Sequence, residues 1–147
     1  SELMDLYLIS QCRFFVGTVS GPIEVAWLFE RPVLATNQID WISYFPHRRG
    51  DRAILKHAFL RAERRFLTLR EVLRHPEFSL YGLGEAYQQA FEMFENSPEE
   101  LETAVIEFIN GLDSDQALSP LQDEFNVLRR AEVRRWLGTA PRLFASE

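Results

Sequence analysis

A short turn that carries glycines and hydroxyl groups lies near the start of the chain. Gly17, Thr18, Val19, Ser20 and Gly21 follow three apolar residues and precede a segment with helical spacing. Backbone N–H groups and the positive end of a helix dipole meet at such a turn, and together they attract an anion. The glycines would let a phosphate approach the backbone, and the two hydroxyls would add donors. The pattern therefore predicts a phosphate-binding turn.

A second interpretation of this turn needs no ligand. Ser20 could only cap the helix and the glycines could only form the bend, as in many α/β proteins that bind nothing there. Three sharper motifs do not fit the spacing. Ser20 is the fourth residue of G-T-V-S-G, whereas a hydrolase elbow is G-x-S-x-G. No lysine follows Gly21 as a Walker loop requires, and the dinucleotide pattern G-x-G-x-x-G is absent. Phosphate binding and simple capping both stay open.

The elements around this turn are predicted from apolar spacing. Residues 1–10 (SELMDLYLIS) place apolar side chains on two neighbouring helical faces, which predicts a largely buried helix. Residues 14–16 predict a short buried strand, Pro22 favours a helix beginning there, and residues 32–37 (PVLATN) predict a second strand. This alternation is typical of a parallel sheet covered by helices. We therefore expect an α/β fold with a Rossmann-like parallel sheet.

The rest of the chain is predicted as loop and helix. Residues 38–60 contain turn-forming residues and a basic cluster, so we expect mostly loop. Capping boxes predict helices after Thr68 and after Ser97. Residues 78–95 fit either a helix or a strand, and that alternative stays open. A last amphipathic helix is expected over 117–137, with these side chains facing inward: Leu121, Phe125, Leu128 and Trp136.

The composition narrows the classes of function. The 147 residues are 46% hydrophobic and 26% charged, which is typical of a folded domain. A net charge of −6 argues against nucleic acid as the main partner, because neutralising phosphates needs a basic excess. Cys12 is the one cysteine, which excludes an intrachain disulfide and fits a reducing compartment. No stretch reads as a membrane span or signal peptide, so we expect a cytoplasmic location.

Charge is distributed unevenly along the chain. Residues 44–75 hold nine Lys or Arg against three acids, whereas residues 76–128 hold twelve acids and no Lys or Arg. The plainer interpretation is that the two segments form solvated faces that partly neutralise one another. The alternative is that the basic segment helps to hold a phosphate beside the glycine turn.

The residues of this turn and its surroundings resemble a known family. The stretch SELMDLYLISQCRFFVGTVSGPIEVAWLFERPVLATN, with ILK, LTLREVL and ENSPEEL later on, resembles the C-terminal part of a bacterial glycosyltransferase family with the pattern S-E-x-x-D-x-Y-L-x-x-x-C-x-F-F-x-G-T-x-S-G. More loosely, it is similar to the donor-binding halves of fucosyltransferases. The resemblance implies the C-terminal half of a GT-B-type glycosyltransferase: a Rossmann-like domain over residues 1–112, followed by a helical extension over 113–147 that packs on it.

The resemblance also implies a substrate and partners. A nucleotide-sugar would be the donor, and an acceptor hydroxyl of unknown identity would receive the sugar. The N-terminal half of the same enzyme would lie outside this chain. Neither a metal nor a separate cofactor is expected.

Carried onto this chain, the resemblance assigns Thr18, Ser20 and Gly21 to the donor diphosphate and Gly17 to the geometry of the turn. Asn37 ends the second predicted strand, where ligands collect in open α/β sheets, and could meet the ribose or base. A role as a turn former that begins the next loop is an equally open alternative for Asn37.

Three basic residues are weaker candidates for the donor site. Lys56 approximately occupies the family's I-x-x-K position and would balance phosphate charge. Arg48 or Arg49 would stabilise the leaving phosphate.

The general base is not identified in this sequence. His47 and His57 are the nearby candidates, but in such enzymes the base usually comes from the other half, so the catalytic residues stay unknown. The three histidines show no metal-ligand spacing. The competing hypothesis is a non-catalytic α/β binding or interaction module, which the acidic stretch and the two amphipathic helices near the end of the chain would favour.

Overall fold

The first elements of the chain alternate between helix and strand. The computed structural model describes residues 2–18, 20–41, 48, 50–75, 89–113 and 118–139. The chain begins with α1 (Glu2–Gln11), β1 (Phe15–Gly17), α2 (Gly21–Leu28) and β2 (Val33–Gln38). This order confirms the helices and strands predicted for the first 37 residues.

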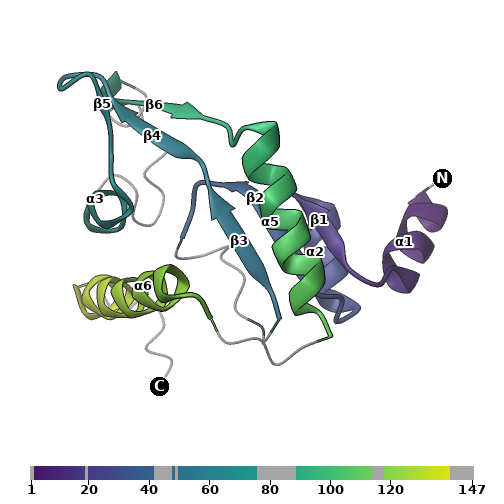
Figure 1. The fold of residues 1–147 in the computed structure, drawn as a ribbon. Helices are drawn as coiled ribbons and strands as arrows, with labels where there is room; N and C mark the ends of the chain where they lie inside the picture. The colour runs from purple at the N-terminus through teal and green to yellow at the C-terminus, as the bar shows by residue number, and fades with distance from the viewer. Residues whose placement is uncertain are drawn as a thin grey trace.

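Sheet A is a parallel sheet of three strands in the order β1-β2-β3, where β3 spans Arg52–Leu55. One of its faces packs against α2, and α5 (Pro98–Gly111) lies across the other face (Figure 1). Because both faces are covered, five of the six residues of the central strand β2 are buried. The predicted α/β class with a parallel sheet is therefore correct.

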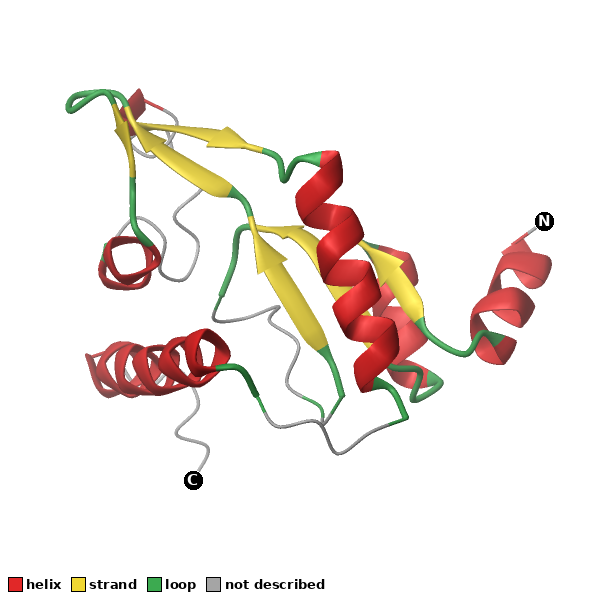
Figure 2. Cartoon of the chain, in the orientation of Figure 1, coloured by secondary structure: helices red, strands yellow, loops and turns green. Residues whose placement is uncertain are grey.

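A second sheet follows directly from the first. Sheet B is antiparallel, in the order β5-β4-β6, and consists of β4 (His57–Leu60), β5 (Arg65–Phe66) and β6 (Phe91–Phe94). Figure 2 shows β3 continuing into β4 as one bent path between the two sheets. The expectation that residues 38–60 are mostly loop is therefore wrong, because β3 and β4 lie inside that range. In the undecided segment 78–95, residues 91–94 are a strand, and residues 78–88 lie outside the described ranges.

The larger core joins sheet B to two helices, α3 (Leu69–Arg74) and α6 (Pro120–Thr139). Its buried members are Trp41, Ala58, Val72, Leu73 and Phe91. From α6, Phe125 and Leu128 pack against this cluster, as predicted, whereas Leu121 is 67% exposed and does not face inward. The side chain of Trp136 lies outside the described part of the chain.

Helix α1 is the main departure from the predicted packing. Figure 1 shows it extending away from sheet A, and none of its side chains is buried. Leu3 is 79% exposed and Tyr7 is 62% exposed, although the sequence predicts a largely buried helix. The apolar side chains point in several directions, so burying them would need neighbours on several sides. Within the described chain α1 packs mainly beside α2. There Ile9 packs against the smaller core between α2 and β2, which consists of these buried residues: Ile23, Ala26, Val33 and Ala35.

Two of the helices begin at capping boxes, as predicted. In α3 the Thr68 side chain accepts from the Glu71 N–H, and the Glu71 carboxylate accepts from the Thr68 N–H. Ser97 and Glu100 make the same reciprocal pair at the start of α5. Each box satisfies backbone donors that the first turn of a helix leaves unpaired.

The capping box of α3 makes stability depend on pH. Hydrogen bonds from the Arg65 guanidinium, and then from Thr68, lower the pKa of Glu71 from 4.5 to about 2. A carboxyl whose pKa is lowered by folding stabilises the fold above its ordinary pKa, and this contribution is lost as pH falls toward the lowered value. We expect Glu71→Gln to lower stability in urea denaturation at pH 7 and to differ progressively less from the unmodified chain between pH 5 and 3. A difference that stays constant over this range would contradict the assignment.

The two oppositely charged segments pair with each other. Side chains of the basic segment 44–75 meet acids that come later in the chain in these contacts: Lys56–Glu95, His57–Glu100, Arg61–Glu92, Arg70–Glu124 and Arg74–Glu132. Most of these pairs are solvent-exposed, so each contributes little to stability. The contacts support the interpretation of the two segments as faces that partly neutralise one another.

Candidate functional site

The carboxyl ends of the three parallel strands meet along one border of sheet A, which we call the carboxyl edge. Gly17 lies opposite Ala35, and Gln38 lies opposite Leu55. The turn that follows β1 therefore lies beside the end of β2, and Lys56 follows the end of β3. In open α/β sheets, ligands bind outside this edge. The structure thus brings the glycine turn, Asn37 and Lys56 to the same border.

The turn itself is closed by Ser20. Its hydroxyl donates to the Thr18 carbonyl over 3.1 Å, and its own carbonyl accepts from the Ile23 N–H at 3.0 Å. Ser20 occupies the N-cap position of α2, but its side chain makes no capping hydrogen bond. The prediction that Ser20 stands at the start of the helix is correct, whereas the capping role of its hydroxyl is not. Among the described residues, no side-chain acceptor caps the start of α2, in which Pro22 has no N–H and Ile23 already donates to the Ser20 carbonyl.

The two glycine positions of the turn differ in whether the surrounding structure requires a glycine. A Cβ at Gly17 would lie 2.9 Å from Cε1 of Phe15. A larger residue would therefore collide with the Phe15 ring, which explains why a glycine stands at this position. No described atom lies within 4 Å of where a Cβ of Gly21 would stand, and Gly21 does not have a positive φ. Neither strain nor packing within the described chain requires a glycine at 21. The open space in front of Gly21 is what close approach of a ligand to the backbone would need.

The turn lies on the open surface. Thr18, Ser20 and Gly21 are all exposed, and packed side chains do not cover them. The large cavity described below is lined by other residues. The turn is therefore part of the exposed carboxyl edge and not part of that cavity.

Asn37 is held by a reciprocal contact with Asn96. Its N–H donates to Oδ1 of Asn96 at 3.2 Å, and the Asn96 N–H donates to Oδ1 of Asn37 at 2.7 Å. Asn96 also donates from Nδ2 to the Leu55 carbonyl at 2.7 Å. Asn37 has a φ of 51°, a conformation that asparagine tolerates better than most residues. These contacts give Asn37 a structural role inside β2, which continues to Gln38, rather than as a residue that begins the next loop.

Lys56 and His57 both have acidic partners. The Lys56 ammonium lies 3.3 Å from Glu95, and Nε2 of His57 lies 2.9 Å from a carboxylate oxygen of Glu100. The hydrogen bond with His57, followed by the one from the Ser97 N–H, lowers the pKa of Glu100. His57 therefore links sheet B to the start of α5.

Arg48 lies at the other border of sheet A. Its carbonyl accepts from the Asp51 N–H, and the Asp51 carboxylate accepts from the N–H of Val33, the first residue of β2. Arg48 therefore stands beside the amino ends of the strands, and the structure does not bring it to the glycine turn. Arg49 and His47 lie outside the described residues.

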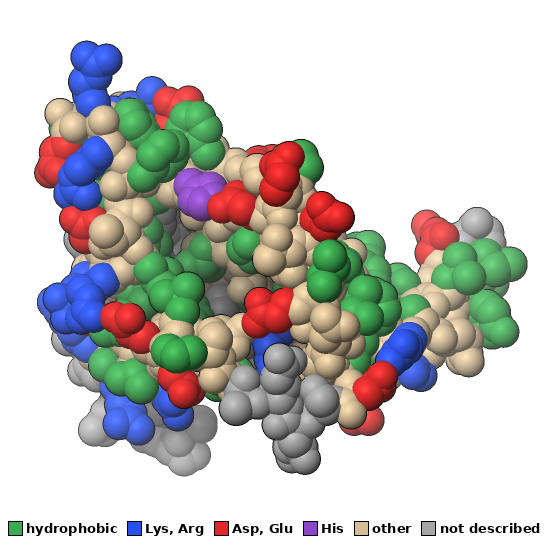
Figure 3. All heavy atoms as spheres, in the orientation of Figure 1, with side chains coloured by type: hydrophobic (Ala, Val, Ile, Leu, Met, Phe, Trp, Pro, Cys, Tyr) green, Lys and Arg blue, Asp and Glu red, His purple; other side chains and the backbone are tan. Residues whose placement is uncertain are grey.

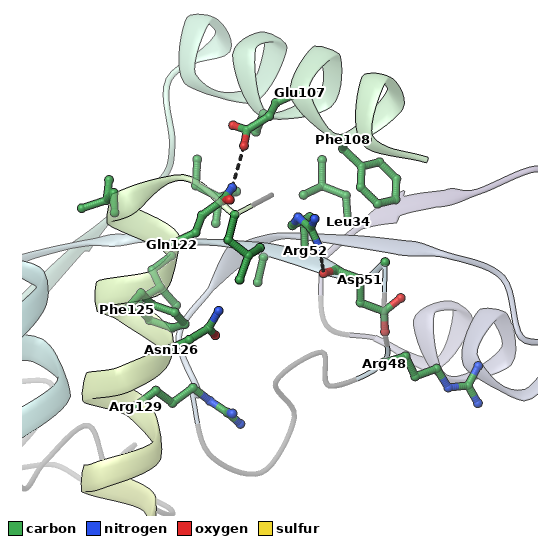
Figure 4. A pocket seen from close by; sticks show the side chains of 18 of the residues that line it. Leu34, Arg48, Asp51, Arg52, Glu107, Phe108, Gln122, Phe125, Asn126 and Arg129 are labelled. Carbon is green, nitrogen blue, oxygen red and sulfur yellow. Dashed lines mark hydrogen bonds between the residues drawn. The ribbon is translucent and has the colours of Figure 1, made fainter. Parts of the chain in front are cut away.

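A cavity of about 1190 Å³ opens between β3, α5 and α6. Figure 3 shows this face hollowed between α5 and α6, with apolar side chains around the hollow, and Figure 4 shows its lining from close by. The whole of β3, from Arg52 to Leu55, lines it, together with Asp51 just before the strand. Sequence patterns do not indicate this cavity, because its walls come from three elements far apart in the chain.

The described ranges contain neither a cluster of metal ligands nor a helix that could span a membrane. Between residues 2 and 139, outside the gaps given above, no group of three or more His, Cys, Asp or Glu side chains is arranged to hold a metal ion. In those same ranges no helix is both long and apolar enough to cross a lipid bilayer.

Comparison with known proteins identifies no relative of this chain. No protein-family model matches this sequence, and no curated protein or solved structure is significantly similar to it. The case for a function therefore depends on the geometry of the site and on the motif in residues 1–37.

Proposed function

We propose that this chain binds the diphosphate of a nucleotide-sugar at the carboxyl edge of sheet A, as the donor-binding part of a glycosyltransferase. The observation that carries the proposal is the exposure of the turn residues Thr18, Ser20 and Gly21, which lead into a helix whose N-cap side chain makes no capping hydrogen bond. The resemblance of residues 1–37 to a bacterial glycosyltransferase family supplies the class of ligand.

The chemistry of such a site follows from charge development. When the sugar is transferred, the bond between its anomeric carbon and the diphosphate oxygen breaks, and a bond from the acceptor oxygen to that carbon forms. The diphosphate leaves with the bonding electrons and gains negative charge, while the acceptor proton passes to a base. Backbone amides at the turn and the dipole of α2 would stabilise the growing charge. The base and the acceptor site would come from outside this chain.

Calorimetric titration with nucleoside diphosphates, the matching nucleotide-sugars and nucleoside monophosphates tests the proposal. We expect saturable binding of diphosphates and weaker binding of monophosphates. Ser20→Ala should weaken diphosphate binding by about tenfold, the effect of one hydrogen bond to a charged group. Gly21→Val should abolish binding, because its side chain would fill the open space in front of the backbone.

Ser10→Ala is the matched control for these variants. The Ser10 hydroxyl also donates to a backbone carbonyl, that of Tyr7 at 2.7 Å, but it lies on α1. Its removal should leave nucleotide affinity unchanged. Binding that Ser20→Ala and Gly21→Val leave intact would overturn the proposed site, and a panel without any binding would overturn the proposed function.

An interaction module is the second candidate, and exposed apolar surface favours it. On the outer face of sheet B, Phe59, Phe66 and Phe94 contact one another edge to face, with ring centroids 5.2 to 6.1 Å apart. Phe66 is 52% exposed, and α1 exposes further apolar side chains. Exposed apolar patches of this kind mark protein contacts in many folds. If the nucleotide panel shows no binding, this alternative is the better account.

A further inference from the structure

The cavity between β3, α5 and α6 combines an apolar wall with cationic side chains. Leu34, Phe108 and Phe125 line it from the sheet, from α5 and from α6 respectively. Its volume of about 1190 Å³ slightly exceeds the roughly 300–1,000 Å³ that is usual for cavities that hold small molecules. Space of this size with an apolar lining accepts the apolar body of a ligand.

Arginines supply the polar part of the lining. Figure 4 shows Arg52 on β3 between the two helices, with Arg129 reaching from α6 toward the same space. Arg52 donates from one nitrogen to the Asp51 carbonyl, and Arg130 donates from Nε to the Asn126 carbonyl. Within the described ranges, neither Arg52 nor Arg130 forms an ion pair with a carboxylate. Both guanidinium groups therefore keep donors for a bound anion.

The carboxylates of the lining, in contrast, already have partners. Asp51 accepts from the Val33 N–H at 2.9 Å, and Glu107 accepts from Nε2 of Gln122 at 2.5 Å. Asp113 forms an ion pair with Arg13. Among the described residues, none of these carboxylates forms an ion pair with Arg52 or Arg130. The four arginines of the lining also outnumber its three acids, and one of these acids, Asp113, is paired with Arg13 outside the lining.

Arg129 shows how poorly solvated one part of this lining is. Burial lowers the pKa of its guanidinium, and the charge of Asp40 opposes this only partly. Its Nε donates to the Trp41 carbonyl at 2.7 Å, which fixes the side chain beside the cavity. In such surroundings an anion interacts more strongly with arginine than it does in water.

We propose that this cavity binds an amphipathic anion, whose carboxylate or phosphate head contacts Arg52 and Arg130 and whose alkyl body lies against the apolar wall. The described lining of the cavity includes no residue of the glycine turn. The inference is therefore independent of the proposed nucleotide site.

Titration with decyl phosphate, decanoate and decanol, each below the concentration at which it forms micelles, tests the inference. We expect one molecule of decyl phosphate or decanoate to bind per chain, and decanol to bind at least about tenfold more weakly because it lacks the charge. The preferred head group distinguishes a phosphate from a carboxylate ligand. Amide shifts in NMR spectra should appear at Ala53, Ala104 and Gln122 rather than at Phe59 and Phe94 on sheet B.

Variants test separately the arginines that would hold the charged head group and the apolar wall that would hold the alkyl body. Arg52→Gln combined with Arg130→Gln should weaken decyl phosphate binding by roughly tenfold or more, while Arg64→Gln, on an exposed turn away from the cavity, should change it less than about twofold. Leu121 lines the cavity but is 67% exposed, so Leu121→Ser should weaken binding without unfolding the chain. Equal binding of decanol and decyl phosphate, unchanged affinity in the double arginine variant, or no saturable binding would each overturn the inference.

Discussion

Replacing Trp41 with alanine is expected to lower the free energy of unfolding by about 3–5 kcal/mol, the range for removing a fully buried aromatic side chain. Trp41 is 0% exposed and has the largest fully buried side chain among the described residues. It lies just after β2 and packs with Leu73 of α3 and Phe91 of β6 in the larger core. A cavity at this position would loosen contacts between elements that are distant in sequence. Because small domains are stable by only about 5–15 kcal/mol, this loss is a large fraction of the total.

Urea denaturation followed by circular dichroism measures this effect, and Trp41→Phe is the control. No described atom accepts a hydrogen bond from the indole N–H of Trp41, so phenylalanine loses no such bond. Phenylalanine also keeps most of the apolar volume, and we expect a clearly smaller loss of stability. Equal losses for alanine and phenylalanine would contradict the role given to Trp41.

Replacing Asn96 with alanine is the second substitution with a large expected effect. Asn96 is 6% exposed, and its side chain joins the ends of β2 and β3 through Asn37 and Leu55. Alanine would leave the Asn37 N–H and the Leu55 carbonyl without these partners. At about 1–3 kcal/mol for each unsatisfied buried group, and with some access for water, we expect a total loss of roughly 2–4 kcal/mol.

Asn126→Ala is the control for this substitution, because among the described residues the Asn126 side chain makes no hydrogen bond and its backbone carbonyl, which accepts from Arg130, is kept in alanine. Its stability in urea should stay within about 0.5 kcal/mol of the unmodified chain. If Asn96→Ala were equally mild, the reciprocal contact between Asn37 and Asn96 would not hold the carboxyl edge together.

Local signals predict much of the fold. The capping boxes at Thr68 and Ser97 mark the starts of α3 and α5 correctly, because each box depends on residues only three positions apart. The positions of strands β1 and β2 are also predicted, and β2 is buried because both faces of the sheet are covered. The predicted burial of β1 is wrong, because β1 is an edge strand in which Val16 is 37% exposed. The caps and the strand positions can be recognised without knowing what lies across the fold.

Non-local contacts account for the parts that were not predicted. Strand β4 pairs with β6, so the neighbour that makes residues 57–60 a strand comes about thirty residues later. The exposure of α1 has the same kind of cause, because apolar spacing indicates that a face prefers burial but does not say which neighbour covers it.

The candidate site was predicted in part for similar reasons. The turn follows β1, and Asn37 is the last residue but one of β2. These strands are neighbours in both sequence and space, so the meeting of the two groups at one edge could be foreseen. Lys56 reaches the same edge because it follows β3. Arg48 precedes β3 instead, which places it at the opposite border of the parallel sheet. The sequence alone does not indicate that residues 52–55 form a parallel strand. It therefore cannot show that Lys56 and Arg48 lie at opposite borders of the sheet.

An NMR titration of the ¹⁵N-labelled chain with inorganic pyrophosphate tests the central claim most directly. The claim is that backbone amides of the turn after β1 bind a diphosphate. We predict saturable shifts of the Thr18, Ser20 and Gly21 amides, which Gly21→Val abolishes and Ser10→Ala preserves. Saturable shifts that are confined to residues around Arg52 and Arg130, or no shift at the turn at any concentration, would contradict the account.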